Sequence, residues 1–299
     1  MADGSPLDMG VNNVQLLDAT SVGKRMIAVG EQGLIVISDD GGDSWLRTDS
    51  TTMATLTAVY FVDDQHGWIV GHRGVALYTT DGGNSWTQGE MELPEEQNAF
   101  FDLWFEDTQR GLALGTFGVV AETTDGGKTW QGRYVLGEDS DFDRHMYAMS
   151  ELADGVLIIA AEQGYLLRSL DRGETWEEIE SPYEGSYFGA ITADDNRILV
   201  FGMRGNAFRS DDAGDSWDKI ELGGNMSLQG ASRLVDGRVV LAGSGGFVGV
   251  SEDNGQTFKR LLIPGRADII SVLSVTDDQL VTFGLKGVAK RSISFAAAQ

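Results

Sequence analysis

Six acidic turns of nearly identical sequence carry the residues of this 299-residue chain that are best suited to chemistry. Each turn follows the pattern Ser/Thr-x-Asp-x-Gly-x-Ser/Thr-Trp/Phe, and TTDGGNSW at 79–86 is one copy. The aspartates are Asp40, Asp81, Asp125, Asp171, Asp212 and Asp253, and the closing aromatic residues are Trp45, Trp86, Trp130, Trp176, Trp217 and Phe258. Carboxylate, hydroxyl and backbone oxygens are ligands that calcium prefers. Each copy could therefore bind a cation, or it could be a structural turn repeated because the fold repeats.

The local sequence favours the structural interpretation. A calcium loop of the EF type needs a bidentate glutamate at its twelfth position, and that position of DDGGDSWLRTDS is a serine. The aspartate can accept backbone N–H hydrogen bonds within its own turn, and the glycines permit positive φ. The aromatic residue can bury a large apolar area against the next sheet. We therefore predict stabilising turns that need neither a metal nor a cofactor.

The spacing of the turns predicts the architecture. A glycine lies five residues before each turn, at Gly33, Gly74, Gly118, Gly164, Gly205 and Gly246, and a seventh, Gly287, has no turn after it, so the spacing is 41 to 46 residues. Within one unit, the runs 56–62, 67–71 and 75–79 are short and rich in β-branched and aromatic residues. A fourth short strand follows each aromatic residue. Four antiparallel strands in 40–45 residues are typical of a propeller blade. We predict an all-β, seven-bladed β-propeller as a single domain over 1–299, with repeats in 14–294 and each acidic turn between strands three and four.

The ends of the chain suggest how the propeller closes. The sequence ends at SISFAAAQ before the seventh unit has an outer strand, and residues 1–13 precede the first unit. We expect residues 1–13 to supply that strand, because closure removes exposed sheet edges. The start MADGSPLDMG resembles a mature N-terminus that follows a removed signal peptide, so we expect a periplasmic or otherwise extracytoplasmic location.

Charge and composition exclude several classes of partner. The chain has 46 acidic and 22 basic residues and a formal charge of −24, so it lacks the basic surface that nucleic acid requires. No apolar run approaches 18 residues, which argues against direct membrane insertion. The absence of cysteine rules out disulfides and thiolate chemistry. We expect a monomer.

The acidic turns resemble the Asp-box, or bacterial neuraminidase repeat. Together with the Gly-x-x-Gly motif in most units, the chain resembles the photosystem II stability and assembly factor family from about residue 14 to residue 292, including bacterial relatives that do not photosynthesise. The resemblance implies a non-enzymatic chaperone or scaffold that docks a membrane-protein partner. It also implies basic residues within the Gly-x-x-Gly turns of one face. The basic residues at the matching positions are Arg73, Arg204 and Lys286, and His72 lies beside Arg73.

The alternative is an Asp-box glycosidase, sialidase-like or endoglucanase-like. The Arg-Ile-Pro tripeptide typical of sialidases is absent, and the three histidines lack metal-ligand spacing. Asp102, in the apolar run FFDLWFED, is the most unusual carboxylate, but one acid without a placed partner does no acid–base chemistry. A glycosidase needs only two suitably separated carboxylates. We predict no catalytic residues and keep hydrolysis as the alternative.

Propellers bind partners mainly through the turns between strands two and three and through the links between blades. The links 87–98 and 131–145 are longer than the others and acidic. Apolar and aromatic residues that open the first strands either pack in the core or contact an apolar anchor, and they are Phe100, Phe101, His145, Met146, Tyr187, Phe188, Met226 and Leu228. Of these, we expect Phe100, His145, Tyr187 and Met226 to offer the apolar contact. If they contact an anchor, the partner is a segment of a membrane, envelope or secreted protein. The basic residues of the turns would then orient this segment.

The closure hypothesis predicts the effect of a deletion. Removing residues 2–11 should lower the melting temperature substantially, because the outer edge of blade seven would lose its strand. A thermal melt followed by circular dichroism measures this. An unchanged melting curve would contradict closure by this segment.

Overall fold

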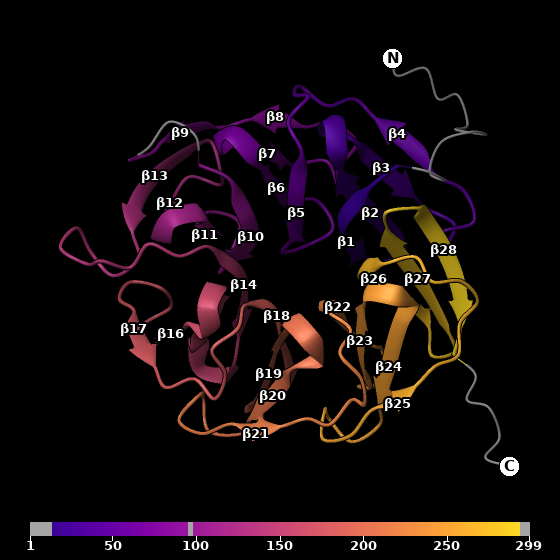
Figure 1. Ribbon diagram of the computed structural model, residues 1–299. Coiled ribbons are helices and arrows are strands. Elements are labelled where there is room, and N and C mark those ends of the chain that lie inside the picture. The colour runs from indigo at the N-terminus through magenta and orange to yellow at the C-terminus, as the bar shows by residue number, and fades with distance from the viewer. Residues whose placement is uncertain (1–13, 95–97, 294–299) are drawn as a thin grey trace, which may run out of the picture. The chain divides into compact units, whose positions relative to one another are not determined.

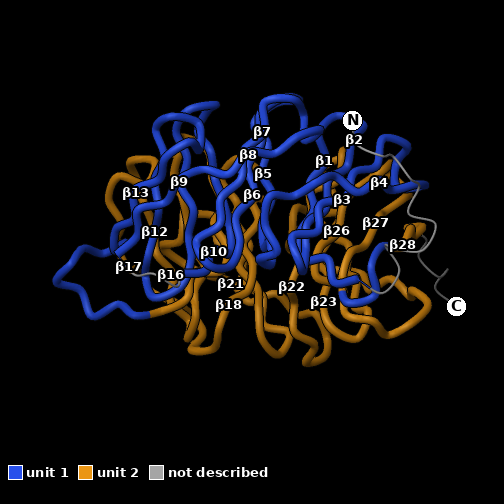
Figure 2. The backbone as a smooth tube through the Cα atoms, turned by 90° about the horizontal axis from the view of Figure 1, so that it is seen from above, with its two compact units in different colours: residues 1–143, 285–288 blue, residues 144–284, 289–299 orange. Residues whose placement is uncertain are grey.

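The computed structural model describes residues 14–94 and 98–293. The chain divides into two compact units, unit 1 with residues 1–143 and 285–288 and unit 2 with residues 144–284 and 289–299 (Figure 2). Residues 1–13, to which we assign the closing strand, lie outside the described residues. No helix of the described part is long and apolar enough to cross a membrane.

Unit 1 contains three sheets, which we call blades one to three (Figure 1). Blade one has β1 (Leu16–Val22), β2 (Arg25–Gly30), β3 (Ile35–Ser38) and β4 (Leu46–Thr48). Blade two has β5 (Leu56–Phe61), β6 (Gly67–Gly71), β7 (Ala76–Thr79) and β8 (Thr87–Gln88). Blade three has β10 (Phe100–Phe105), β11 (Gly111–Gly115), β12 (Val119–Thr123) and β13 (Thr129–Tyr134), and β9 (Glu90–Glu92) joins its edge.

Blades four to six belong to unit 2, and blade seven lies largely in it. Blade four has β14 (Met146–Glu151), β15 (Leu157–Ala161), β16 (Leu166–Ser169) and β17 (Glu177–Ile179). Blade five has β18 (Tyr187–Asp194), β19 (Arg197–Gly202), β20 (Ala207–Ser210) and β21 (Asp218–Lys219). Blade six has β22 (Leu228–Arg233), β23 (Val239–Gly243), β24 (Phe247–Ser251) and β25 (Lys259–Arg260). Blade seven has β26 (Ile269–Thr276), β27 (Gln279–Gly284) and β28 (Gly287–Ser292).

The predicted fold class, an all-β seven-bladed propeller, is confirmed. The strands expected at 56–62, 67–71 and 75–79 are β5, β6 and β7, and each acidic turn joins the third strand of a blade to the fourth. One element is not predicted by the sequence pattern. The acidic link 87–98 contains β9, which pairs in parallel with β13 and gives blade three a fifth strand.

The acidic turns are held together by their own aspartates. In each of the six turns, an Oδ1 atom accepts the N–H of the second Ser/Thr at 2.9 Å. In the turn of blade four, the Thr175 hydroxyl also donates to Asp171 Oδ2 at 2.6 Å, and the Ser169 hydroxyl donates to Oδ1 at 2.7 Å. These hydrogen bonds from Thr175 and Ser169 lower the pKa of Asp171 to about 2. Protein donors thus occupy both carboxylate oxygens.

The aromatic residue of each turn packs at the border of two blades. Trp86 shares a hydrophobic cluster with Ile27 and Ile37 of blade one, and Trp130 shares one with Trp68 of blade two. These neighbours belong to the blade that precedes each tryptophan in the chain. The prediction that the tryptophan packs against the next sheet is therefore wrong for Trp86 and Trp130. Burial is complete or nearly so for Trp45, Trp86 and Trp130 and partial for Trp176, Trp217 and Phe258.

Every blade has a β-bulge near the start of its first strand. The register against the second strand shifts after the first residue in all seven first strands, so the second residue has no partner in the ladder. A bulge redirects the side chain of the extra residue. The bulge residues are Leu17, Thr57, Phe101, Tyr147, Phe188, Gln229 and Ile270, and all are partly exposed. The residues just before them, including Phe100 and Tyr187, are fully buried.

The carboxylate of Asp171 should make stability depend on pH. Its pKa of about 2 in the fold lies below the ordinary value of 3.8, so its contribution is present above that value and is lost as pH falls towards 2. Urea midpoints measured between about pH 5 and pH 2 should fall less steeply for Asp171→Asn than for the wild type. Parallel declines would contradict this role of the turn.

The bulge predicts that two adjacent truncations in blade five lower the free energy of unfolding by unequal amounts. Tyr187→Ala should lower the free energy of unfolding by about 3–5 kcal/mol, because it empties a fully buried aromatic site. Phe188→Ala should cost less, about 0.5–1.5 kcal/mol for the loss of its aromatic pair with Tyr147, because the ring of Phe188 is partly exposed. Urea unfolding of both variants measures the difference, and equal losses would contradict the observed register.

Candidate functional site

The turns between the second and third strands share one backbone conformation. They form the short 3-10 segments η1 (Glu31–Gly33), η2 (His72–Gly74), η3 (Thr116–Gly118), η5 (Glu162–Gly164), η6 (Met203–Gly205) and η7 (Ser244–Gly246). The middle residue of each has a left-handed φ between 56° and 65°. These middle residues are Gln32, Arg73, Phe117, Gln163, Arg204 and Gly245. A left-handed conformation costs an L-residue roughly 1–2 kcal/mol relative to glycine, so five blades keep a side chain at a position where glycine fits best.

Each turn is fixed to the segment that leads into the first strand of its blade. In blade two, the His72 N–H donates to the Thr55 carbonyl at 2.9 Å. A Cβ atom on Gly71 would lie only 2.2 Å from that same oxygen, so no other residue fits there. The turn residue and the first strand are therefore held at a fixed separation.

The predicted basic residues are exposed on these turns. Arg73 and Arg204 occupy left-handed middle positions, and Lys286 lies in the turn between β27 and β28. Within the described residues, none of the three forms a salt bridge. His72 is also exposed, and its ring meets that of Phe101 edge to face, with centroids 6.5 Å apart.

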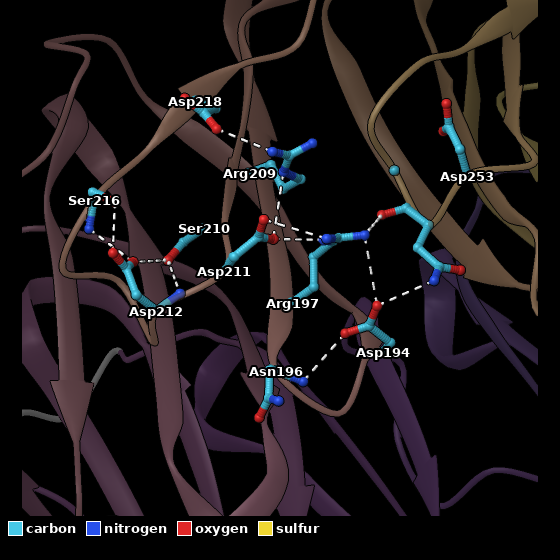
Figure 3. A network of polar contacts seen from close by, with 12 residues as sticks. Asp194, Asn196, Arg197, Arg209, Ser210, Asp211, Asp212, Ser216, Asp218 and Asp253 are labelled. Atoms are coloured by element: carbon cyan, nitrogen blue, oxygen red, sulfur yellow. Dashed lines mark hydrogen bonds and ion pairs between the residues drawn. The ribbon is translucent and has the colours of Figure 1, made fainter.

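Several arginines near the acidic turns are, by contrast, paired. Figure 3 shows Arg197 of blade five, whose Nε donates to Asp211 Oδ1 at 2.5 Å and whose Nη1 donates to the Asn254 carbonyl of blade six at 3.3 Å. The hydrogen bond from Arg197 lowers the pKa of Asp211. In unit 1, Arg25 joins Asp39 to the Gly82 carbonyl in the same way. These guanidinium groups join neighbouring blades.

The four predicted apolar contacts divide into two kinds. Phe100 and Tyr187 are fully buried, which supports the core-packing alternative for both. His145 and Met226 are half-buried, and the Met226 sulfur lies over the turn glycine Gly205. Phe101 and Phe188, which lie one position further along the first strands at the bulges, are partly exposed.

Three aromatic rings gather at the start of blades four and five. The Tyr147 ring meets His145 at 6.2 Å and Phe188 at 5.6 Å between centroids, both edge to face. Glu162 of η5 accepts the His145 N–H at 3.3 Å, and the Glu162 N–H donates to the His145 carbonyl at 2.9 Å. Burial and then the Glu162 charge raise the pKa of Tyr147, so its hydroxyl stays protonated at neutral pH. We call His145, Tyr147 and Phe188 the aromatic group.

The acidic and histidine side chains of the described residues are dispersed. No cluster of three or more His, Asp or Glu side chains in that part of the chain could hold a metal ion. Asp102 accepts the N–H of the adjacent Leu103 at 2.8 Å, a local structural contact. The η turns carry the exposed residues Arg73 and Arg204, and His72 of η2 contacts an aromatic ring.

Comparison with solved structures supports the fold over almost the whole chain. A structure of YCF48 bound to D1 peptide is 22% identical with a TM-score of 0.74, covering 98% of this chain and 95% of that one. YCF48 from Cyanidioschyzon merolae is 18% identical with a TM-score of 0.76, covering 97% and 98%. The GH74 enzyme of Niastella koreensis is 14% identical with a TM-score of 0.77, covering 99% of this chain and 55% of that one. At these identities, the likeness shows the fold alone.

A search of curated proteins by sequence finds no match. A family model described as photosynthesis system II assembly factor YCF48 matches residues 44–102 and 90–220, together more than half of the chain. This chain therefore belongs to the YCF48 family of photosynthesis system II assembly factors.

Proposed function

We propose that this protein is a non-enzymatic assembly factor that holds an extended segment of a protein partner on the face bearing the η turns. The observation that carries the proposal is a turn with an exposed cation, free of salt bridges among the described residues, that contacts a partly exposed aromatic bulge residue. His72 and Phe101 show this arrangement in unit 1, where Arg73 follows His72 in the same turn. Family membership supports an assembly role.

The geometry suggests how the segment is recognised. An apolar or aromatic side chain of the partner would contact the aromatic group or Phe101, since interface energy concentrates on such anchors. Acidic groups of the partner would pair with Arg73, Arg204 or Lys286 through charge-assisted hydrogen bonds. The D1 peptide bound by a YCF48 of similar fold supports a peptide segment as the ligand class.

Further parts of the proposal rest on the sequence. We place the protein outside the cytoplasm, as a monomer, with a segment of a membrane or envelope protein as its partner. We assign it no hydrolase activity, because catalytic carboxylates would need a placed partner and a substrate site. Turnover of a chromogenic glycoside, abolished by one carboxylate substitution on the turn face, would favour the glycosidase alternative instead.

Site-specific photo-crosslinking tests the docking face. A benzoylphenylalanine at position 188 or 101 should capture a discrete partner from an extract of the source cells, because both positions are half-exposed bulge sites. The same probe at position 235, where Val235 is 84% exposed in the turn between β22 and β23, should not capture it. Mass spectrometry of the adduct identifies the partner and the crosslinked segment.

Matched variants test the role of the cations. The variants are Arg73→Gln and Arg204→Gln. Blades one and four already hold glutamine at this turn position in the same backbone conformation, so both variants should fold. Together they should weaken binding of the identified segment by roughly fivefold at low salt and reduce its salt dependence, since exposed ion pairs are individually weak. Capture at position 235 but not at 188 or 101 would move the site to the opposite face.

A further inference from the structure

A pocket of about 590 Å³ lies beside the turn of blade three, within unit 1. One wall is η3, and the other is the link that follows β13. Its lining combines aromatic rings and carboxylates, from Phe117, Tyr134, Phe142, Glu138, Asp141 and Asp143, together with Ser140.

The link is packed against the turn. The Val135 N–H donates to the Gly118 carbonyl at 2.8 Å. A Cβ atom on Gly118 would lie 2.7 Å from the Phe142 carbonyl oxygen, so the link approaches the turn as closely as a glycine permits. Within the link, the Ser140 N–H donates to the Gly137 carbonyl at 3.2 Å, and the Phe142 N–H donates to the Ser140 hydroxyl at 3.1 Å. A backbone hydrogen bond and a close backbone approach therefore join the two walls of the pocket.

The lining suits an organic cation. Phe117 is 45% exposed and occupies the turn position that holds Arg73 in blade two. The face of an aromatic ring attracts ammonium and guanidinium groups. Glu138 and Asp141 are exposed, and no described residue forms a salt bridge with either. Carboxylates so placed can accept charge-assisted hydrogen bonds from a cation that stacks on the rings.

Neither a solvated acidic surface nor a metal site accounts for all of these features. A solvated acidic link would explain the carboxylates, but not the aromatic rings that share the pocket with them. A metal ion would need several oxygen ligands around one point, and no such group of three acidic side chains occurs in the described residues.

We propose that this pocket receives the side chain of an arginine or lysine in the bound segment, an inference that rests on the proposed function. The turn of blade three then selects a charge opposite to the one that Arg73 selects in blade two. The partner segment carries a basic residue at a fixed distance from its acidic and apolar ones.

Short peptides test the pocket without knowledge of the partner. The probes are the blocked peptide Gly-Ser-Arg-Ser-Gly, its lysine counterpart, and a control in which neutral citrulline replaces arginine. Each is titrated into the full-length ¹⁵N-labelled protein while the amide resonances of Phe117, Ser140 and Phe142 are followed. We expect saturable shifts with the two basic peptides and none with citrulline.

Matched variants separate the pocket from general electrostatics. Phe117→Gln introduces the residue that blades one and four hold at this position, and it should weaken arginine-peptide binding roughly threefold. Glu138→Gln combined with Asp141→Asn should weaken it roughly fivefold. Glu31→Gln removes one charge from another turn and should leave binding unchanged. Loss of binding in Glu31→Gln as large as in the double variant, or equal shifts with citrulline, would overturn the inference.

The remaining outcomes distinguish this inference from the proposed function. Saturable shifts with calcium chloride alone, at the same amides, would make the pocket a metal site and overturn the inference. Partner capture at position 188 with no response to basic peptides would refute the pocket and leave the docking function standing. A response to basic peptides without any crosslinked partner would refute the docking function and leave a cation pocket.

Discussion

In each blade with an acidic turn, one carboxylate holds the hairpin between the third and fourth strands. Where the third strand ends, the aspartate of the turn accepts an N–H at 2.9 Å and two hydroxyl groups, as Asp171 does from Thr175 and Ser169. This fixes the path of the hairpin and so the direction of the aromatic residue that follows. The same hairpins present carbonyl groups to arginines of the preceding blade, such as Gly82 to Arg25 and Ala213 to Arg168. The turns thus organise both the blade and its border.

The arginines that contact these carbonyl groups differ from the basic residues of the η turns. Several arginines near the acidic turns are engaged in salt bridges, whereas Arg73, Arg204 and Lys286 on the opposite turns form none among the described residues. Because His72, the neighbour of Arg73, meets the bulge residue Phe101, the turn of blade two is the strongest candidate for recognition.

The sequence is sufficient to predict the repeat, the strand order within a blade and the position of the acidic turns. Periodicity and spacing report these directly, because turn residues and apolar runs recur at fixed offsets. Which of the apolar candidates at the start of the first strands are buried is not decided by the sequence pattern. Positions 100 and 101 are both phenylalanine, and only the hydrogen-bond register decides that Phe100 is buried and Phe101 partly exposed. Strand β9 escapes prediction because its sequence, Glu-Met-Glu, has little strand propensity and pairs only through a contact distant in sequence.

The left-handed turns have a consequence for how binding specificity can diverge. Glutamine, arginine, phenylalanine and glycine occupy the same backbone conformation at equivalent positions of six blades, with φ between 56° and 65°. The backbone contacts that hold a turn are made by its other residues, as those of Gly71 and His72 show. A single substitution at the middle position can therefore exchange a positive, neutral or aromatic contact in one blade without a compensating change elsewhere. Each blade can in this way present a different side chain on an unchanged backbone.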